Sequence, residues 1–185
     1  CAIPVLVTGG IHIDGFMDTM DAFSSFGTKE KKLAILKDPH IGSFAVISLL
    51  AYGLIYAAAF SVIKSRDLTG IVCCGFFLSR VMSGLGVMLL PAAKNEGMSF
   101  TVKESADRNR VTAILAIEGL ICIIVMAVIS LYGLLAAAFS VLSFIFYYRK
   151  TMKELGGVTG DTAGFFLLVC ELSIMIAAAL AECIR

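Results

Sequence analysis

Charged residues are scarce in this chain of 185 residues: they make up 16% of it, whereas hydrophobic residues make up 59%. Soluble globular domains carry about 25% charged and roughly 45–50% apolar residues, so the chain lies outside that class and a lipid bilayer is its expected solvent. The net charge is only +1. This value argues against a nucleic-acid partner, because such proteins present a concentrated basic face.

Metal-binding cysteine patterns are also missing. The six cysteines show no CxxC or Cys/His spacing, and most lie in apolar runs, where cysteine behaves as a small hydrophobic residue. We therefore expect neither a disulfide framework nor a zinc site. The chain has no internal repeat and starts at Cys1 without a signal-peptide pattern, so we expect an upstream part to precede it.

Long apolar runs predict the fold. A membrane-spanning helix needs about 20 mostly apolar residues. Residues 1–7 look like the end of one such helix. The sequence thus predicts an all-α, polytopic transmembrane helical bundle that forms a single membrane catalytic domain over residues 1–185. The five complete spans are expected at 43–63, 70–90, 111–129, 132–148 and 163–183.

The basic residues predict the orientation of these spans. Most of the 15 lysine and arginine residues lie in segments 24–40, 91–110 and 149–161, which five crossings place on one side of the membrane. The positive-inside rule makes this side cytoplasmic, so we expect a multi-pass protein of the cell membrane. The stretches "TGGIHIDGFMDTMDAF" (8–23), "LKDPHIGSF" (36–44) and "ELGGVTGDTAG" (154–164) should converge on the same side.

Three acids stand out in the first of these stretches. If residues 12–22 are helical, Asp18 lies about 40° and Asp21 about 20° around the helix from Asp14, so all three share one narrow face. Carboxylates this close repel one another, and burial increases the cost. A divalent cation, a lysine or arginine, or bound protons could offset the repulsion.

Magnesium fits this pattern, because it prefers oxygen ligands and completes its shell with water and substrate phosphates. Asp161 is a candidate fourth oxygen donor from another helix, and Lys37 and Arg80 could supply positive charge to a diphosphate. The chemistry indicated is metal-assisted phosphoryl or nucleotidyl transfer at the cytoplasmic membrane surface. Backbone N–H groups could cradle phosphate oxygens at Gly9, Gly10, Gly15, Gly156, Gly157 and Gly160.

Structural explanations stay open beside the metal site. The three acids could form a solvated cap, or Asp14 and Asp18 could neutralise Lys31 and Lys32. His12 lies about 160° around the helix from Asp14, which favours a packing or hydrogen-bonding role over metal ligation.

Two ionisable residues fall inside predicted spans, where such residues are functional candidates. Arg80 could contact substrate, or it could form an internal ion pair with Glu118 or Glu171.

Four motifs, in this order, resemble the cobalamin synthase family. They are "TGGIHIDGFMDTMDAF", "LKDPHIGSFAV", "LSR" (78–80) and "GGVTGDTAG" followed by Glu171. The resemblance extends from Thr8 to the last span, with minor departures at His40, Phe44 and Ala45.

This resemblance implies a reaction of late cobalamin assembly that uses Mg²⁺. A ribose hydroxyl of α-ribazole, or of its 5′-phosphate, attacks the cobinamide-side phosphorus of adenosylcobinamide-GDP. GMP leaves, and adenosylcobalamin or its 5′-phosphate forms. The implied partners are these substrates and the lipid bilayer, with a homo-oligomer as a candidate assembly.

The resemblance also implies residue roles. Asp14, Asp18, Asp21 and Asp161 would bind metal and act in catalysis, with Asp21 as the candidate base for the hydroxyl. The substrate-binding set comprises Gly9, Gly10, His12, Lys37, Asp38, Arg80, Gly157, Thr159, Gly160 and Glu171.

Two rival functions follow from the same acids. A CDP-alcohol phosphotransferase also uses clustered aspartates, but its motif D(x)2DG(x)2AR differs from the D(x)3D(x)2D spacing found here. A proton- or sodium-coupled transporter would relay ions through residues such as Glu118, but such proteins usually show repeated halves and acids at mid-membrane.

Overall fold

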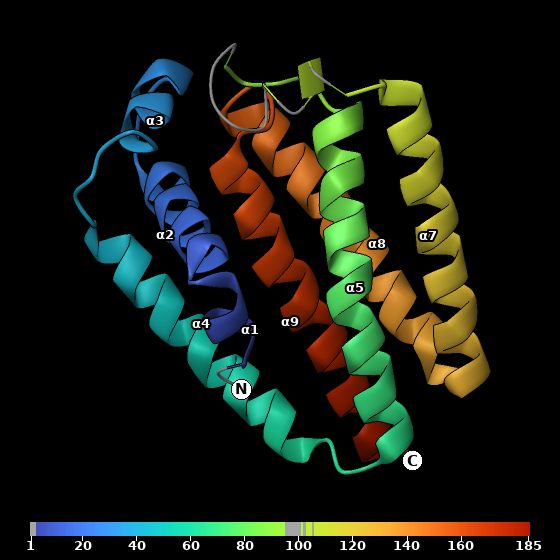
Figure 1. The fold of residues 1–185 in the computed structure, drawn as a ribbon. Coiled ribbons are helices and arrows are strands. Elements are labelled where there is room, and N and C mark those ends of the chain that lie inside the picture. The colour runs from blue at the N-terminus through green and yellow to red at the C-terminus, as the bar shows by residue number, and fades with distance from the viewer. Residues whose placement is uncertain (1–2, 95–100, 102, 105) are drawn as a thin grey trace.

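The computed structural model describes residues 3–94, 101, 103, 104 and 106–185. Eight named helices lie in this part of the chain, and the figure labels are used for them (Figure 1). They are α1 (Ile3–Thr8), α2 (Ile11–Ser24), α3 (Lys29–Ile35), α4 (Ser43–Val62), α5 (Arg66–Leu89), α7 (Arg108–Ile129), α8 (Tyr132–Glu154) and α9 (Gly160–Ile184).

Five of these helices are long and apolar enough to cross a membrane, namely α4, α5, α7, α8 and α9. The predicted fold class, an all-α polytopic bundle with five complete spans, is therefore confirmed, whereas the exact limits of the spans stay predictions. The observed helices mostly run further than the apolar stretches, because charged residues can continue a helix beyond the hydrocarbon while their side chains reach water. The expected span end at 1–7 stays a prediction, since Cys1 and Ala2 lie outside the described residues and α1 has six residues.

Helix α9 is the centre of the bundle. It packs against α2, α4, α5 and α8, whereas α7 packs mainly on α5 and α8 at one side (Figure 1). The outer helices α4 and α7 expose large apolar side chains, such as Leu54 (73% exposed) and Val128 (82% exposed). This distribution fits lipid contact, because lipid tails solvate such side chains as well as a protein core does.

The helix starts are capped in two ways. Thr28 and Asp107 cap α3 and α7 with their own side chains, as helix N-terminal residues commonly do. Helix α5 instead borrows a cap from α9: Glu182 Oε2 accepts hydrogen bonds from the backbone N–H groups of Ser65 (3.1 Å) and Lys64 (3.3 Å). The borrowed cap ties the start of α5 to the end of α9.

The polar connections gather at one end of the bundle, as expected. Helix α3, the segment after α5 and the α8–α9 turn lie at the top of Figure 1, opposite the C-terminus. Two backbone hydrogen bonds join the second and third of these connections: Ala93 N–H donates to Val158 O (2.9 Å), and Val158 N–H donates to Pro91 O (2.8 Å). The three stretches predicted to converge, 8–23, 36–44 and 154–164, also meet at this end, because residues from each of them line one cavity.

Candidate functional site

A cavity of about 600 Å³ opens at this end of the bundle. Helices α2, α5 and α9 form its walls, and the segments at Leu36–Lys37, Lys94 and Val158–Thr159 surround it. The polar side chains that line it come from every wall. They are His12, Asp14, Lys37, Ser83, Lys94, Thr159 and Asp161.

Asp14 and Asp161 face the same cavity because α2 and α9 approach backbone to backbone. A Cβ atom on Gly15 would lie 2.8 Å from the Asp161 carbonyl oxygen, and a Cβ on Gly164 would lie 3.2 Å from the His12 carbonyl oxygen. Small residues at both contact points permit this approach, as they do in other membrane helix pairs. The predicted meeting of these two acids at one site is thus realised.

The start of α9 holds Asp161 in place. Thr159 and Thr162 form a reciprocal capping box, with Thr162 N–H donating to Thr159 Oγ1 (3.2 Å) and Thr159 N–H donating to Thr162 Oγ1 (2.9 Å). Thr159 Oγ1 also lies 3.4 Å from Asp161 Oδ2. Gly157 precedes this turn and packs on Ala92 and Ala93, where a Cβ atom would lie only 2.5 Å from Ala93 N.

Asp18 lies one turn beyond Asp14 on α2, outside the residues that line the cavity. Its pKa is raised to about 6, first by burial and then by repulsion from Asp14, Asp161 and Asp21. The repulsion among acids that the sequence predicts is therefore present. A bound cation would relieve it.

Asp21 has a different position from the one that a shared metal site suggests. Its carboxylate accepts hydrogen bonds from the backbone N–H groups of Gly42 (2.7 Å) and Ala45 (2.8 Å), at the start of α4. The N-cap residue of α4 is Gly42, which has no side chain to do this. A glycine before a long apolar helix was the available signal for a borrowed cap, and sequence reasoning missed it. The roles of Asp21 as metal ligand and base stay predictions.

The donor set fits one mode of Mg²⁺ binding. In the part of the chain that the structure describes, no three His, Cys, Asp or Glu side chains are grouped so that they could hold a metal ion by themselves. Mg²⁺ often binds through one or two carboxylates and takes its other ligands from water and phosphate. Asp14 and Asp161, which face one cavity from two helices, match that mode.

Two lysines complete the cavity rim. Lys37 is one of the predicted residues, and Lys94 was missed by sequence reasoning. Lys94 Nζ donates to Leu33 O (2.9 Å) and lies within electrostatic range of Asp161. Lys94 follows the predicted span 70–90, which ends on the polar side of the bundle, and this position was the available signal that it belongs to the site. Both cations can meet an anionic substrate here.

His12 and Gly160 also line the cavity, as predicted, together with Thr159. The pKa of His12 is lowered by burial and by the nearby positive charge of Arg80, which favours the neutral imidazole.

Other predicted residues lie outside the cavity lining. Gly9 and Gly10 form the turn between α1 and α2 with positive φ values of 62° and 82°, a conformation that favours glycine. Asp38 accepts a hydrogen bond from His40 N–H (3.0 Å) and contacts the His40 ring, which lowers the Asp38 pKa. Lys32 pairs with Glu154, so it does not neutralise Asp14 or Asp18.

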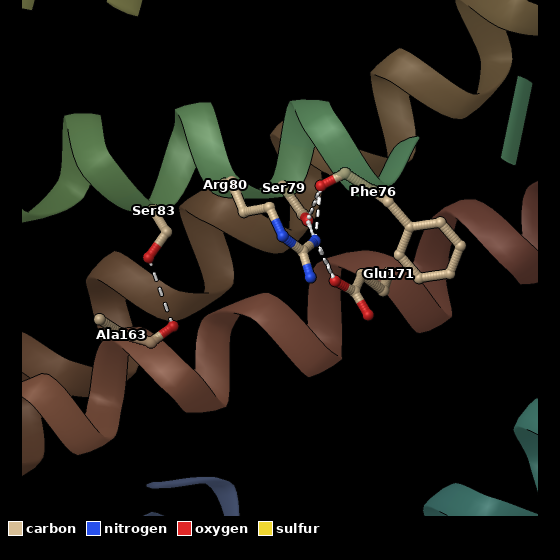
Figure 2. A network of polar contacts seen from close by, with 6 residues as sticks. All are labelled: Phe76, Ser79, Arg80, Ser83, Ala163 and Glu171. Atoms are coloured by element: carbon tan, nitrogen blue, oxygen red, sulfur yellow. Dashed lines mark hydrogen bonds and ion pairs between the residues drawn. The ribbon is translucent and has the colours of Figure 1, made fainter. Parts of the chain in front are cut away.

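Arg80 forms the internal ion pair that the sequence allowed, and its partner is Glu171. Nη1 of Arg80 lies 2.6 Å from Glu171 Oε1, across the α5–α9 interface (Figure 2). Neither residue is among those that line the cavity. One turn further along α5, Ser83 Oγ donates to Ala163 O (3.4 Å) at the cavity wall (Figure 2).

Comparison with known proteins gives a consistent result. A family model described as cobalamin-5-phosphate synthase matches residues 1–179. An adenosylcobinamide-GDP ribazoletransferase of Lachnoclostridium phytofermentans is 41% identical over 98% of this chain and 69% of its own length. Enzymes with the same name from Clostridium perfringens (34% identical, 92% of this chain, 68% of the relative) and Pseudomonas savastanoi pv. phaseolicola (32%, 95%, 72%) also match. No solved structure matches the chain.

Proposed function

The chain belongs to the cobalamin-5-phosphate synthase family, and we propose that it transfers the cobinamide phosphate of adenosylcobinamide-GDP to α-ribazole or its 5′-phosphate, with release of GMP. The observation that carries this proposal is the cavity lined by Asp14, Asp161, Lys37 and Lys94. Two acids and two cations around one space suit a reaction at a diphosphate. The rival functions draw no support from the family match.

The two lysines have the simplest role in this reaction. Lys37 and Lys94 would bind the diphosphate oxygens and offset the negative charge that the acids present to an anionic substrate. Both lysines lie on connecting segments rather than on the helices that form the cavity walls, so they would meet a substrate at the cavity rim.

The acids would hold a divalent ion together with the substrate. Asp14 and Asp161 are the candidate Mg²⁺ ligands in the cavity, and Asp18 adds negative charge behind them. When bound, Mg²⁺ would polarise the phosphoryl oxygens and stabilise charge on the leaving GMP. The role of this chain's residues is to place two carboxylates at one point from two helices.

Of the two α2 acids outside the cavity lining, Asp18 rather than Asp21 has the proton affinity of a general base, and it would reach a substrate hydroxyl through a water. A pKa near 6 lets a carboxylate take up a proton close to neutral pH, which is the property that a general base needs. Asp21 is already engaged by two backbone N–H groups at the start of α4, one on each carboxylate oxygen, so it has a structural role there.

We further propose that the cavity end faces the cytoplasm. The excess of lysine and arginine in the connections at this end supports the orientation. Nucleotide substrates would then enter directly from the cytoplasm.

The test is GMP release from adenosylcobinamide-GDP by the detergent-solubilised full-length protein, with and without α-ribazole and Mg²⁺. Release should require both additions and should fall at least 100-fold in Asp14→Asn, since electrostatic groups at a reacting phosphate typically contribute about this much. The matched control is Asp67→Asn at the opposite end of the bundle, where the carboxylate pairs with Arg185. A folded wild-type protein that releases no GMP would refute the proposed function.

A further inference from the structure

Among the described residues, the ion pair between Arg80 and Glu171 is the most buried charge contact between two spans. The Glu171 side chain is 7% exposed, and Arg80 Nη1 also contacts Phe76 O (2.5 Å) and Ser79 Oγ (3.1 Å). Ser79 Oγ in turn donates to Glu171 Oε1 (3.3 Å). Figure 2 shows the guanidinium between α5 and α9, with its carboxylate partner on α9.

Stability alone does not explain this pair. The free-energy cost of removing two charges from water can equal or exceed the gain from their attraction. Apolar residues of similar volume can therefore often replace a buried ion pair without loss of stability. The α5–α9 interface also has apolar contact of its own: Gly75 lies so close to Ile174 that a Cβ atom would be 2.7 Å from Ile174 Cγ2. A charged residue inside a span therefore calls for a functional explanation.

The hydrogen bonds and the ion pair of the guanidinium are one-sided, while its carbon lies over the Phe76 ring (5.9 Å to the ring centroid). Within the described residues, its hydrogen bonds and its ion pair all use Nη1. A guanidinium carries five N–H donors, so those on Nη2 and Nε stay available. The Arg80 side chain is 38% exposed, so the pair does not enclose it.

The guanidinium also lies next to the cavity. Ser83 and Gly84, which follow Arg80 by one turn of α5, line the cavity wall. His12 lines the opposite wall on α2, and Arg80 is close enough to act on its charge. Arg80 thus lies at the α5–α9 interface, one helical turn from the cavity wall and within electrostatic range of His12 on α2.

We propose that Glu171 is a positioning residue, which holds Arg80 by Nη1 so that the remaining N–H groups of the guanidinium bind the diphosphate of the substrate at the deep end of the cavity. Arginine suits this role, because it stays charged and can bind two phosphate oxygens at once. Glu171 itself then makes no substrate contact. The inference rests on the proposed function for the identity of the diphosphate.

The decisive comparison is between Glu171→Gln and the reversed pair Arg80→Glu/Glu171→Arg. Glu171→Gln keeps the side-chain shape but removes the charge that holds the guanidinium. We expect it to raise the KM for adenosylcobinamide-GDP about tenfold or more, the size expected when a charged hydrogen bond is misplaced. The KM for α-ribazole should stay unchanged, and Glu171→Asp should recover part of the loss.

The reversed pair distinguishes a positioning role of Glu171 from a purely structural one, in which the ion pair only holds α5 against α9. The reversed pair keeps an ion pair between α5 and α9, so its Tm in detergent should stay close to that of the wild type. Its KM for adenosylcobinamide-GDP should nevertheless stay as high as that of Glu171→Gln, because no guanidinium projects from α5. Recovery of the wild-type KM in the reversed pair would overturn the proposal, because a helix clamp works in either direction. An unchanged KM in Glu171→Gln would overturn it as well. Glu182→Gln is the control, since this α9 glutamate caps α5 far from the cavity.

GDP binding without Mg²⁺ provides a readout that does not need turnover. Calorimetry should show binding about tenfold weaker in Glu171→Gln than in the wild type or Glu182→Gln, by the same loss of a charged hydrogen bond. A wild type that binds GDP in this pattern but releases no GMP would refute the proposed reaction and leave the positioning role standing. Equal GDP binding by all three proteins would refute the positioning role.

Discussion

The close contact between α2 and α9 predicts that a larger residue at Gly15 will disturb the site, and the structure gives the size of the disturbance. In Gly15→Ala the new Cβ would lie 2.8 Å from the Asp161 carbonyl oxygen and 3.0 Å from its Cα, both backbone atoms that cannot rotate away. Ordinary contact begins at 3.4 Å, so α2 must move from α9 by roughly 0.6 Å, an overpacking that costs about 1–3 kcal/mol. Asp14 and Asp161 move apart with their helices.

A shift of this size should affect catalysis more than folding. Misplacement of reacting groups by about 1 Å can cost roughly 100-fold in rate, so we expect kcat to fall between ten- and 100-fold while the protein still folds. Higher Mg²⁺ should not restore the rate, because the ligands rather than the ion are displaced. GMP release and Tm, measured on the same preparation, give both values.

Two other glycines provide variants with a smaller expected effect and with no expected effect. A Cβ on Gly164 would meet the His12 carbonyl oxygen at 3.2 Å, so Gly164→Ala should have a smaller effect. A Cβ on Gly53 in α4 meets nothing within 4 Å, so Gly53→Ala should leave kcat unchanged. Full activity in Gly15→Ala, or equal losses in all three variants, would refute the argument that close helix approach builds the site.

Four further predictions concern the cap of α4, the α2 acids and the orientation in the membrane. Asp21→Asn keeps the shape but weakens the cap of α4, so we expect a lower Tm, by about 1–2 kcal/mol in unfolding free energy; an unchanged Tm would remove Asp21 from the cap. The pKa of Asp18 is raised to about 6, so protons should compete with Mg²⁺ below that pH, and the Mg²⁺ concentration for half-maximal activity should rise from pH 7 to pH 5. A flat profile would contradict this coupling. Lower pH should weaken Mg²⁺ binding but stabilise the metal-free protein. A carboxylate whose pKa is raised in the folded state binds a proton more readily there than in the unfolded chain, so the Tm of the metal-free protein should increase as the pH falls from 7 to 5. Cys183 is exposed at the end opposite the cavity, so a membrane-impermeant maleimide added to intact cells should label it; labelling only after lysis would reverse the orientation.

The acids illustrate a compromise between stability and function. Asp18 is partly buried beside three other carboxylates, and its raised pKa records that the ionised form is disfavoured there. A fold selected only for stability would separate these charges. Bringing them together is useful when a cation and an anionic substrate bind between them.

The sequence could predict the spans because hydrocarbon imposes one rule on every residue within it. A backbone in lipid must be helical, and about 20 apolar residues are needed to cross, so composition and length suffice without knowledge of any neighbour. The helical spacing of Asp14, Asp18 and Asp21 is likewise a local property, and α2 is indeed a helix over these residues.

The partners of these side chains are not local. The sequence left Arg80 with two possible partners, and only the packing of α5 on α9 selects Glu171. Asp21 shares a helix face with Asp14, but its carboxylate accepts a hydrogen bond from Gly42 N–H at the start of α4, a segment that folds back against α2.

By itself, the sequence determined a polytopic helical membrane protein, the end of the bundle that carries its polar groups, and a family resemblance that implies a diphosphate reaction. Tertiary structure decided which acids face the cavity, that Lys94 joins Lys37 at its rim, and that Glu171 holds Arg80. The physical reason is range. Hydropathy and helical periodicity act within one segment, whereas a cavity exists only where glycine contacts such as Gly15 against Asp161 set the separation of two helices.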